Sequence, residues 1–258
     1  MALQNNKGLG QHWLKDRSVL SRIADCADIN PTDTVLEIGP GLGTLTSELL
    51  RRATKVVAVE FDEALASKLP SQFPGKDLRV VHSDILSYDL SELPKNYVVV
   101  ANVPYYITSK IVQMLMTAAN KPRTTVLLVQ KEVAERLAAR PGDMSILAVS
   151  AQLFADVTLG DIVPAAFFTP PPKVDSQVVI LRTRATPFLT DVSEKEFFRM
   201  VKAGFSSKRK KLRSSLAGGL GLSKQEVEEL LGTAGISPDR RAEELSLGEW
   251  ATLTRVAQ

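Results

Sequence analysis

Asn102, Pro104 and Tyr105 are the residues of this chain whose types and spacing indicate the most specific chemistry. An exocyclic amine on adenine is a poor nucleophile because its lone pair is delocalised into the ring. The amide oxygen of Asn102 and the carbonyl of Val103 or Pro104 could accept its two N–H groups and favour a pyramidal nitrogen. Pro104 fixes the backbone, and Tyr105 could stack on a base that has left its own stack. No strong general base is needed, because the amine becomes acidic once it is methylated.

A glycine loop precedes this corner and indicates a nucleotide-like cofactor. Gly39, Gly41 and Gly43 lie between an expected strand and an expected helix. Glycines let the backbone turn tightly and approach a ligand closely, and the helix N-terminus beyond could face an anion. A dinucleotide enzyme could use such a loop too, but the Gly-Pro-Gly-Leu-Gly spacing differs from G-x-G-x-x-G. No nicotinamide-type catalytic pattern follows it.

Two acidic residues follow the next two expected strands. The carboxylate of Glu60 could accept both hydroxyls of a ribose, and Asp84 could accept from an adenine amino group. Taken singly, each residue could instead be a helix cap or a surface acid. Taken with the glycines and Asn102, they favour S-adenosylmethionine as the cofactor and a nucleobase as the methyl acceptor.

Alternating apolar strands and helices predict an α/β domain with a mainly parallel sheet covered on both faces. Ligands of such sheets bind outside the carboxyl ends of the strands, which is where all the residues above are expected. The expected strands are Thr34–Ile38, Lys55–Glu60, Leu78–His82, Tyr97–Ala101 and Thr125–Gln130, with helices at Arg17–Asp28, at Leu45 to Leu50 and at Ile107–Ala118.

The later part of the chain changes in character. Asp156–Val163 and Gln177–Arg184 are expected to be strands, in an antiparallel pair, on either side of a proline-rich segment. After Thr186 only helices are expected, so we place a catalytic domain at residues 1–186 and a small all-helical domain at 187–258. The expected helices of the second domain are Ser193–Phe205, Lys208–Leu216, Lys224–Leu231 and Leu247–Val256.

Composition and charge limit the classes of protein that fit. The 258 residues contain one cysteine, Cys26, which excludes an intramolecular disulfide and a multi-cysteine zinc site, and no metal site is expected. No apolar run approaches the roughly 18 residues of a membrane span, so we expect a cytoplasmic protein without a membrane partner. We also expect a monomer. The net charge is only +3, but five basic residues cluster in one segment, which favours a polyanionic partner or forms a solvated helix face. They are Lys208, Arg209, Lys210, Lys211 and Arg213.

Seven motifs in order resemble those of a known family, the ribosomal RNA adenine N6,N6-dimethyltransferases, and most closely the bacterial small-subunit type. The resemblance covers almost the whole chain. Gly10 to Leu14 looks like G-Q-N-F-L, Glu37 to Gly43 like the cofactor loop, Asn102 to Thr108 like N-L-P-Y-x-I-S, and Gln130 to Val133 like Q-K-E-V. Phe168 to Ser176 is nearly unchanged from the family form, Phe205 to Leu212 resembles F-x-x-R-R-K-x-L, and Arg241 to Ser246 resembles R-A-E-x-L-S.

The resemblance implies a Rossmann-like S-adenosylmethionine-dependent methyltransferase fold and a specific substrate. Two methyl groups would go onto each of two adjacent adenines in a hairpin loop near the 3′ end of 16S rRNA. The substrate would be a pre-assembled small ribosomal subunit, whose rRNA phosphates the basic segment could contact. By position, the cofactor contacts would be His12, Leu14, Gly39, Glu60, Asp84 and Asn102.

Two departures from the family pattern concern the expected cofactor and base pocket. His12 stands where the family usually has Asn, and Tyr106 stands where Asn or Gln is common. An aromatic residue at Tyr106 could narrow the base pocket or add stacking. Phe168 is a candidate second wall for the base, or else a core aromatic before a proline turn.

Other functions remain open at this stage. A dimethyltransferase acting on one adenine of large-subunit rRNA, conferring antibiotic resistance, would share the chemistry and differ in its RNA. A DNA adenine methyltransferase would share only the Asn-Pro-Tyr corner. A catalytically weakened small-subunit assembly factor is kept open by His12, although the intact corner argues against it.

Overall fold

The computed structural model describes residues 12–258, which form two compact units. The first unit comprises the described residues up to Glu135 together with Ala155–Thr183, and the second comprises Arg136–Phe154 and Arg184–Gln258. The first boundary falls within helix α5 (Lys131–Leu137). The sequence led us to assign residues 136–154 to the first domain, whereas their contacts group them with the C-terminal helices, because Met144, Val149 and Leu153 join the apolar core there.

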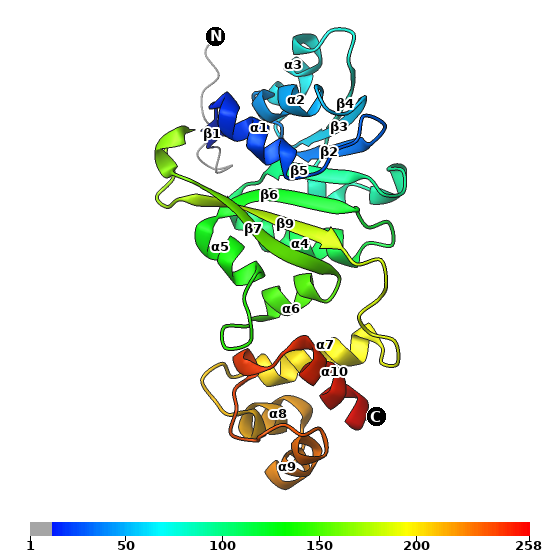
Figure 1. The fold of residues 1–258 in the computed structure, drawn as a ribbon, viewed down its shortest axis with the longest axis vertical. Helices are drawn as coiled ribbons and strands as arrows, with labels where there is room; N and C mark the ends of the chain where they lie inside the picture. The colour runs from blue at the N-terminus through cyan, green and yellow to red at the C-terminus, as the bar shows by residue number, and fades with distance from the viewer. Residues whose placement is uncertain (1–11) are drawn as a thin grey trace. The chain divides into compact units, whose positions relative to one another are not determined.

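A seven-stranded sheet forms the centre of the first unit, in the order β4-β3-β2-β5-β6-β9-β7 (Figure 1). Strands β2 to β6 run parallel to one another, while β9 is antiparallel to both β6 and β7. This confirms the α/β class and the antiparallel pair. The strands are β2 (Thr34–Ile38), β3 (Lys55–Glu60), β4 (Asp77–His82), β5 (Val98–Asn102), β6 (Thr124–Gln130), β7 (Ala155–Val163) and β9 (Ser176–Thr183).

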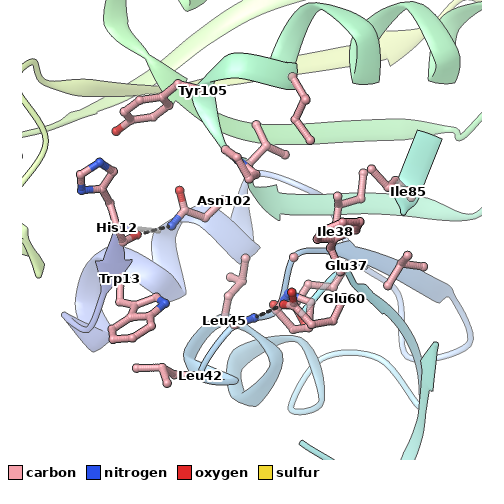
Figure 2. Close-up of a pocket in the computed structure, with 18 of the residues that line it drawn as sticks. His12, Trp13, Glu37, Ile38, Leu42, Leu45, Glu60, Ile85, Asn102 and Tyr105 are labelled. Carbon is pink, nitrogen blue, oxygen red and sulfur yellow. Dashed lines mark hydrogen bonds between the residues drawn. The ribbon is translucent and has the colours of Figure 1, made fainter. Parts of the chain in front are cut away.

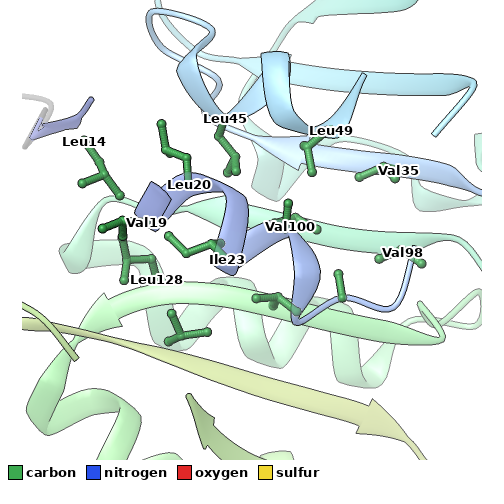
Figure 3. Close-up of a cluster of buried hydrophobic side chains, with 14 of the residues drawn as sticks. Leu14, Val19, Leu20, Ile23, Val35, Leu45, Leu49, Val98, Val100 and Leu128 are labelled. Atoms are coloured by element: carbon green, nitrogen blue, oxygen red, sulfur yellow. The ribbon is translucent and has the colours of Figure 1, made fainter. Parts of the chain in front are cut away.

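The central strands are apolar on both faces, as expected for a sheet covered by helices on both sides. Along β5, Val98 and Val100 pack in one apolar cluster, which the side chains of α1 and α2 complete (Figure 3). Val99, between them, points to the other face and is also buried. The helices of this unit are α1 (Arg17–Asp25), α2 (Thr44–Leu49), α3 (Glu63–Lys68) and α4 (Thr108–Thr117), with the start of α5.

Side-chain caps fix where two of these helices begin. The Asp16 carboxylate accepts from the backbone N–H of Val19 at the start of α1. Asp62 accepts from the N–H groups of Ala64 and Leu65 at the start of α3. Helix α1 ends at Asp25, earlier than the expected Asp28, because Asp28 has a positive φ of 48°.

The strand order places the glycine loop at a topological switch point. From β2 the chain continues to β3 on one side, and after β4 it returns to β5 on the other side of β2. A crevice forms outside the carboxyl ends of the strands where the order reverses in this way. A two-residue antiparallel ladder, β1 (Trp13–Leu14) with β8 (Phe168–Thr169), pairs Leu14 with Phe168.

The second unit is entirely helical among the residues described. Phe197 and Trp250 are fully buried at its centre, and Gly204 lies so close to Trp250 that a Cβ there would be 2.3 Å from the indole. None of the helices formed by residues 12–258 is long and apolar enough to cross a membrane. The helices are α6 (Ile146–Gln152), α7 (Glu194–Phe205), α8 (Leu212–Leu220), α9 (Lys224–Thr233) and α10 (Leu247–Val256).

Helix α8 begins four residues later than the sequence indicated. Residues 206–210 form turns, and the helix starts at Leu212 rather than Lys208. The backbone N–H of Leu212 donates to the carbonyl of Arg240 at 2.7 Å, so a contact distant in sequence fixes the start of the helix.

Candidate active site

A cavity of about 350 Å³ opens at the carboxyl ends of β2, β3, β4 and β5. It lies within the first unit and has the size of a small-molecule site. Figure 2 shows acidic side chains toward one end and Asn102, His12 and Tyr105 toward the other; we call these the cofactor end and the amine end. The expected site residues on its wall are His12, Leu14, Gly39, Gly41, Glu60, Asp84, Asn102, Pro104 and Tyr105.

The glycine loop approaches the cavity through two of its three glycines. Gly39 and Gly41 have φ angles of 66° and 56°, which favour glycine, and both line the cavity. Gly43 was also expected to bind the cofactor, but it does not lie on the cavity wall. It begins α2 with φ 80°, and a Cβ there would be 2.7 Å from the Leu69 side chain. Its role in this geometry is close packing.

Glu60 is held rigidly at the end of β3. Its side chain is only 6% exposed. One carboxylate oxygen accepts from the N–H of Gly41 at 3.0 Å and the other accepts from the N–H of Asp62 at 2.9 Å. Burial raises the pKa of Glu60 above its ordinary value. The loop and the acid therefore fix each other, and each oxygen keeps a lone pair for a ligand.

Asp84 caps a short turn and also lies on the cavity wall. One carboxylate oxygen accepts from the N–H of Leu86 at 2.9 Å and so caps the 3-10 turn η3 (Ile85–Ser87). The cap uses Oδ1 and leaves Oδ2 available to a ligand. Ile85 and Leu86 continue the wall beside it.

Glu37 is a site residue that the sequence analysis did not single out. It lines the cavity at 1% exposure, and its Oε2 atom has no hydrogen-bond partner among the described residues. Burial is the main cause that raises the pKa of Glu37 to about 8; the nearby charge of Glu60 contributes to this rise, and hydrogen bonds with Thr46 oppose part of it. A glutamate inside the otherwise apolar strand β2 was the available signal.

Asn102 presents its amide oxygen to the amine end of the cavity. Its Nδ2 group donates to the backbone carbonyl of His12 at 3.2 Å, which turns Oδ1 the other way (Figure 2). The carbonyl of Pro104 accepts from the N–H of Ile107 at 3.2 Å. This bond closes the 3-10 turn η5 (Tyr105–Ile107), which leads into α4.

Tyr105 is held by a residue far away in the sequence. Its hydroxyl forms a 2.7 Å hydrogen bond with Oγ of Ser176, which is fully buried in β9. The ring of His12 stacks against that of Tyr105 at a centroid distance of 5.9 Å and an angle of 20°. Nδ1 of His12 donates to the carbonyl of Pro170 at 2.7 Å. Ser176 and Pro170 therefore orient both rings, and neither was expected to do so.

Phe168 does not lie on the cavity wall. Its side chain is 3% exposed and packs in the core of the first unit with Val163 and Val178. The backbone pairing of Phe168 with Leu14 directs the side chain inward. The expectation of a second wall is wrong for this geometry, in which the ring facing Tyr105 is that of His12.

Residues His12–Leu14, which we call the strap, contact both ends of the cavity. Asn102 donates to the carbonyl of His12, and the hydroxyl of Thr44 donates to the carbonyl of Leu14 at 3.0 Å. The indole of Trp13 lies beside Gly41. Gly10 and Gln11, which begin the expected motif, fall outside the described residues.

The basic segment lies in the second unit and divides into two groups. Lys211 pairs with Asp239 at 2.9 Å, and Arg213 pairs with Glu228 at 3.4 Å and with Asp239 at 3.6 Å. Lys208, Arg209 and Lys210 are exposed in the turn before α8 and form no ion pair with any residue in the described part of the chain. These three carry the segment's uncompensated charge.

The family model for ribosomal RNA adenine dimethylase matches residues 2–258. The chain belongs to this family. A relative from Dehalococcoides mccartyi, named ribosomal RNA small subunit methyltransferase A, is 46% identical over 98% of this chain and 89% of its own length. A relative of the same name from Desulfitobacterium hafniense is 43% identical over 96% of this chain and 91% of its own.

Two solved structures resemble nearly the whole chain. A dimethyladenosine transferase from Plasmodium falciparum matches with a TM-score of 0.81 at 30% identity, over 94% of this chain and 96% of that one. The 23S rRNA methyltransferase ErmE matches with a TM-score of 0.78 at 31% identity, over 95% of this chain and 98% of that one. The fold is therefore the Rossmann-like methyltransferase fold that the sequence predicted.

The cofactor of this dimethylase is S-adenosylmethionine, which supplies an activated methyl group on a cationic sulfur. The residues at the cofactor end fit it. Gly39 and Gly41 allow close backbone approach, Glu60 offers fixed acceptors for hydroxyls, and Asp84 has an unused oxygen. A cationic ligand beside the unpartnered Oε2 of the buried Glu37 would favour the ionised form of this carboxyl group and so suits the site.

Proposed function

We propose that this dimethylase methylates N6 of two adjacent adenines in a hairpin loop near the 3′ end of small-subunit 16S rRNA. The reaction would be part of small-subunit biogenesis in the cytoplasm. The observation that carries the proposal is the fixed amide of Asn102, whose oxygen faces a cavity lined by Glu60 and Asp84. The names of the two relatives support the small subunit as the source of the RNA.

The amine end would activate the target amine by holding it. Oδ1 of Asn102 accepts one N–H, and a backbone carbonyl of the corner accepts the other, which draws the nitrogen toward a pyramidal shape. Tyr105 stacks on the base, and its bond to Ser176 keeps the ring in place. The proton leaves after methylation, when the amine has become acidic, so no buried base is required. These groups would account for catalysis mainly by orientation and electrostatic complementarity.

The first unit, which corresponds mostly to the expected domain 1–186, would be catalytic, and the helical unit that includes 187–258 would bind rRNA. Lys208, Arg209 and Lys210 have charge available for phosphates, whereas Lys211 and Arg213 are paired with acids of their own unit. We therefore narrow the expected RNA contact to the first three of the five residues.

A salt titration separates the two groups of basic residues. Replacing Lys208, Arg209 and Lys210 together by Gln should weaken subunit binding and reduce the slope of log affinity against log salt by about 2 to 3. The matched variant, Lys211→Gln with Arg213→Gln, should change the slope less and lower the stability of the helical unit. An unchanged slope in the triple variant would contradict this assignment.

The decisive experiment is transfer from labelled S-adenosylmethionine to unmethylated small subunits. Primer extension would map the label, with large subunits and duplex DNA as parallel substrates. Label at two adjacent adenines near the small-subunit 3′ end is the expected result. Label only on large subunits would assign the protein to the resistance type. Tight subunit binding without transfer would instead support an assembly factor.

A further inference from the structure

Two large aromatic side chains remain exposed on the wall of the active-site cavity. Phe61 is 59% exposed and Tyr106 is 66% exposed, and both line the cavity. Phe61 directly follows Glu60 at the cofactor end, while Tyr106 directly follows Tyr105 at the amine end. Apolar rings exposed at a binding cavity mark places where a ligand covers them.

A hydrogen-bonded turn fixes the backbone of Tyr106. It is the central residue of η5, which the bond from the N–H of Ile107 to the carbonyl of Pro104 closes. Among the residues described, Tyr106 is in contact with no other aromatic ring, whereas one face of Tyr105 is stacked against His12. The face of Tyr106 is therefore available to a flat partner.

A positive charge lies one helical turn beyond this ring. Lys110 is exposed in the first turn of α4, lines the same cavity and forms no ion pair with any residue of 12–258. The first turn of α4 contains no acidic residue, and the helix dipole adds to the positive potential there. An aromatic face beside an unpaired lysine suits a nucleotide, whose base stacks and whose phosphate is anionic.

We propose that Tyr106 and Lys110 form a subsite for the nucleotide next to the target adenine. This inference rests on the proposed function, since it requires a single-stranded RNA substrate whose target base enters the amine end. The neighbouring nucleotide stays attached through the backbone and must lie at the cavity rim. Tyr106 stacks on its base and Lys110 contacts its phosphate. In a substrate with two adjacent adenines, this base is the second adenine.

The subsite assigns different tasks to the two exposed rings, which gives a matched pair of variants. Tyr106→Ala should raise the KM for subunits about 5- to 30-fold, as for loss of one stacked base, and leave the affinity for S-adenosylmethionine within about twofold. Phe61→Ala should instead weaken S-adenosylmethionine binding and leave the KM for subunits nearly unchanged. Tyr106→Phe keeps the ring and should recover most of the affinity that Tyr106→Ala loses.

The neighbouring base and the phosphate can each be tested separately. On subunits whose rRNA carries uracil beside the remaining target adenine, wild-type KM should rise and the defect of Tyr106→Ala should shrink, because stacking on a pyrimidine is weaker. Lys110→Gln should raise KM about 2- to 10-fold and reduce the salt slope by about one. Equal KM values for wild type and Tyr106→Ala, or an equal loss of cofactor affinity in both alanine variants, would overturn the subsite.

The subsite and the proposed function can fail independently in these experiments. If wild-type protein methylates large subunits instead, the small-subunit assignment is wrong and the same variants are compared on large subunits. If it methylates neither, the subsite is tested by equilibrium binding of a hairpin RNA with two adjacent loop adenines. Weaker binding by Tyr106→Ala, abolished when the second adenine is made abasic, supports the subsite, and equal binding overturns it.

Discussion

The two ends of the active-site cavity are built in different ways. At the cofactor end, Glu60 and Asp84 are fixed by backbone N–H groups that lie nearer to them in the sequence. Gly41 is 19 residues from Glu60, and Leu86 is 2 residues from Asp84. At the amine end, Asn102 and Tyr105 depend on His12 and Ser176, which lie 90 and 71 residues away in the sequence. Short-range motifs can therefore build a cofactor site, while orienting a reactive amide and a ring requires parts of the fold that are distant in sequence.

The largest expected effect is at the amine end. Asn102→Ala removes both the acceptor for the target amine and the donor to the strap, and should lower kcat for methyl transfer about 100- to 1,000-fold. Cofactor and subunit affinity, measured by calorimetry and sedimentation, should stay within about fivefold. The control His12→Asn keeps the backbone carbonyl that Asn102 contacts, so it should retain most activity. A variant Asn102→Ala that transfers methyl groups normally would contradict the role.

The next effect concerns the buried acid of the cofactor end and its pH dependence. Burial raises the pKa of Glu37 from 4.5 to about 8, so between these values the folded chain holds a proton that the unfolded chain has released. The contribution of this group to stability is complete below pH 4.5 and is lost as the pH rises toward the folded value, by about 1.4 kcal/mol per pH unit.

Glu37→Gln cannot ionise, so the free energy of unfolding should fall less steeply with pH in this variant. Between about pH 5 and pH 7, the difference between wild type and variant should change by about 3 kcal/mol. Urea unfolding without cofactor, at a series of pH values, measures this change. Glu60, whose pKa is also raised by burial, would leave a residual slope in the variant. Parallel curves would show that Glu37 is not a buried protonated acid.

A smaller effect is expected where the cofactor end is fixed by local contacts. Glu60→Ala leaves the N–H groups of Gly41 and Asp62 without their acceptor, and should weaken S-adenosylmethionine binding about 10- to 50-fold. Glu60→Gln keeps one acceptor oxygen and should lose less. Calorimetric titration distinguishes the three proteins, and equal affinity in all of them would contradict the idea that Glu60 fixes the loop.

The smallest effect tests the distant support of the amine end. Ser176→Ala should lower kcat about 3- to 10-fold with little change in KM, because Tyr105 loses its fixed orientation but keeps its ring. Ser176→Thr retains the hydroxyl and should restore part of the rate. Combining Ser176→Ala with Tyr105→Phe should cost no more than the larger single change, since both remove one hydrogen bond. Additive losses would show that Ser176 acts elsewhere.

The parts of the molecule that the sequence predicted well are those with local causes. Strands Thr34–Ile38 and Lys55–Glu60 have the expected bounds, because buried parallel strands are short apolar runs with clear breaks. The residues at their carboxyl ends meet in one cavity because the sheet is parallel.

The predictions that were wrong depended on contacts distant in sequence. Phe168 was a candidate second wall or else a core aromatic before a proline turn, and its pairing with Leu14 turns it into the core. Gly43 resembles its neighbours in the loop, but Leu69 and Phe73 pack where its side chain would be. The start of α8 depends on Arg240. No periodicity or motif reports such contacts.

The strap has a consequence for the order in which substrates act on the enzyme. Its backbone carbonyls accept from Thr44 beside the cofactor loop and from Asn102 at the amine end. We therefore expect a displacement of the strap by one ligand to be felt at the other site, which would link occupancy of the two sites thermodynamically. Linkage is reciprocal: the factor by which cofactor tightens RNA binding equals the factor by which RNA tightens cofactor binding. Spent cofactor and methylated RNA would then be retained or released as coupled events.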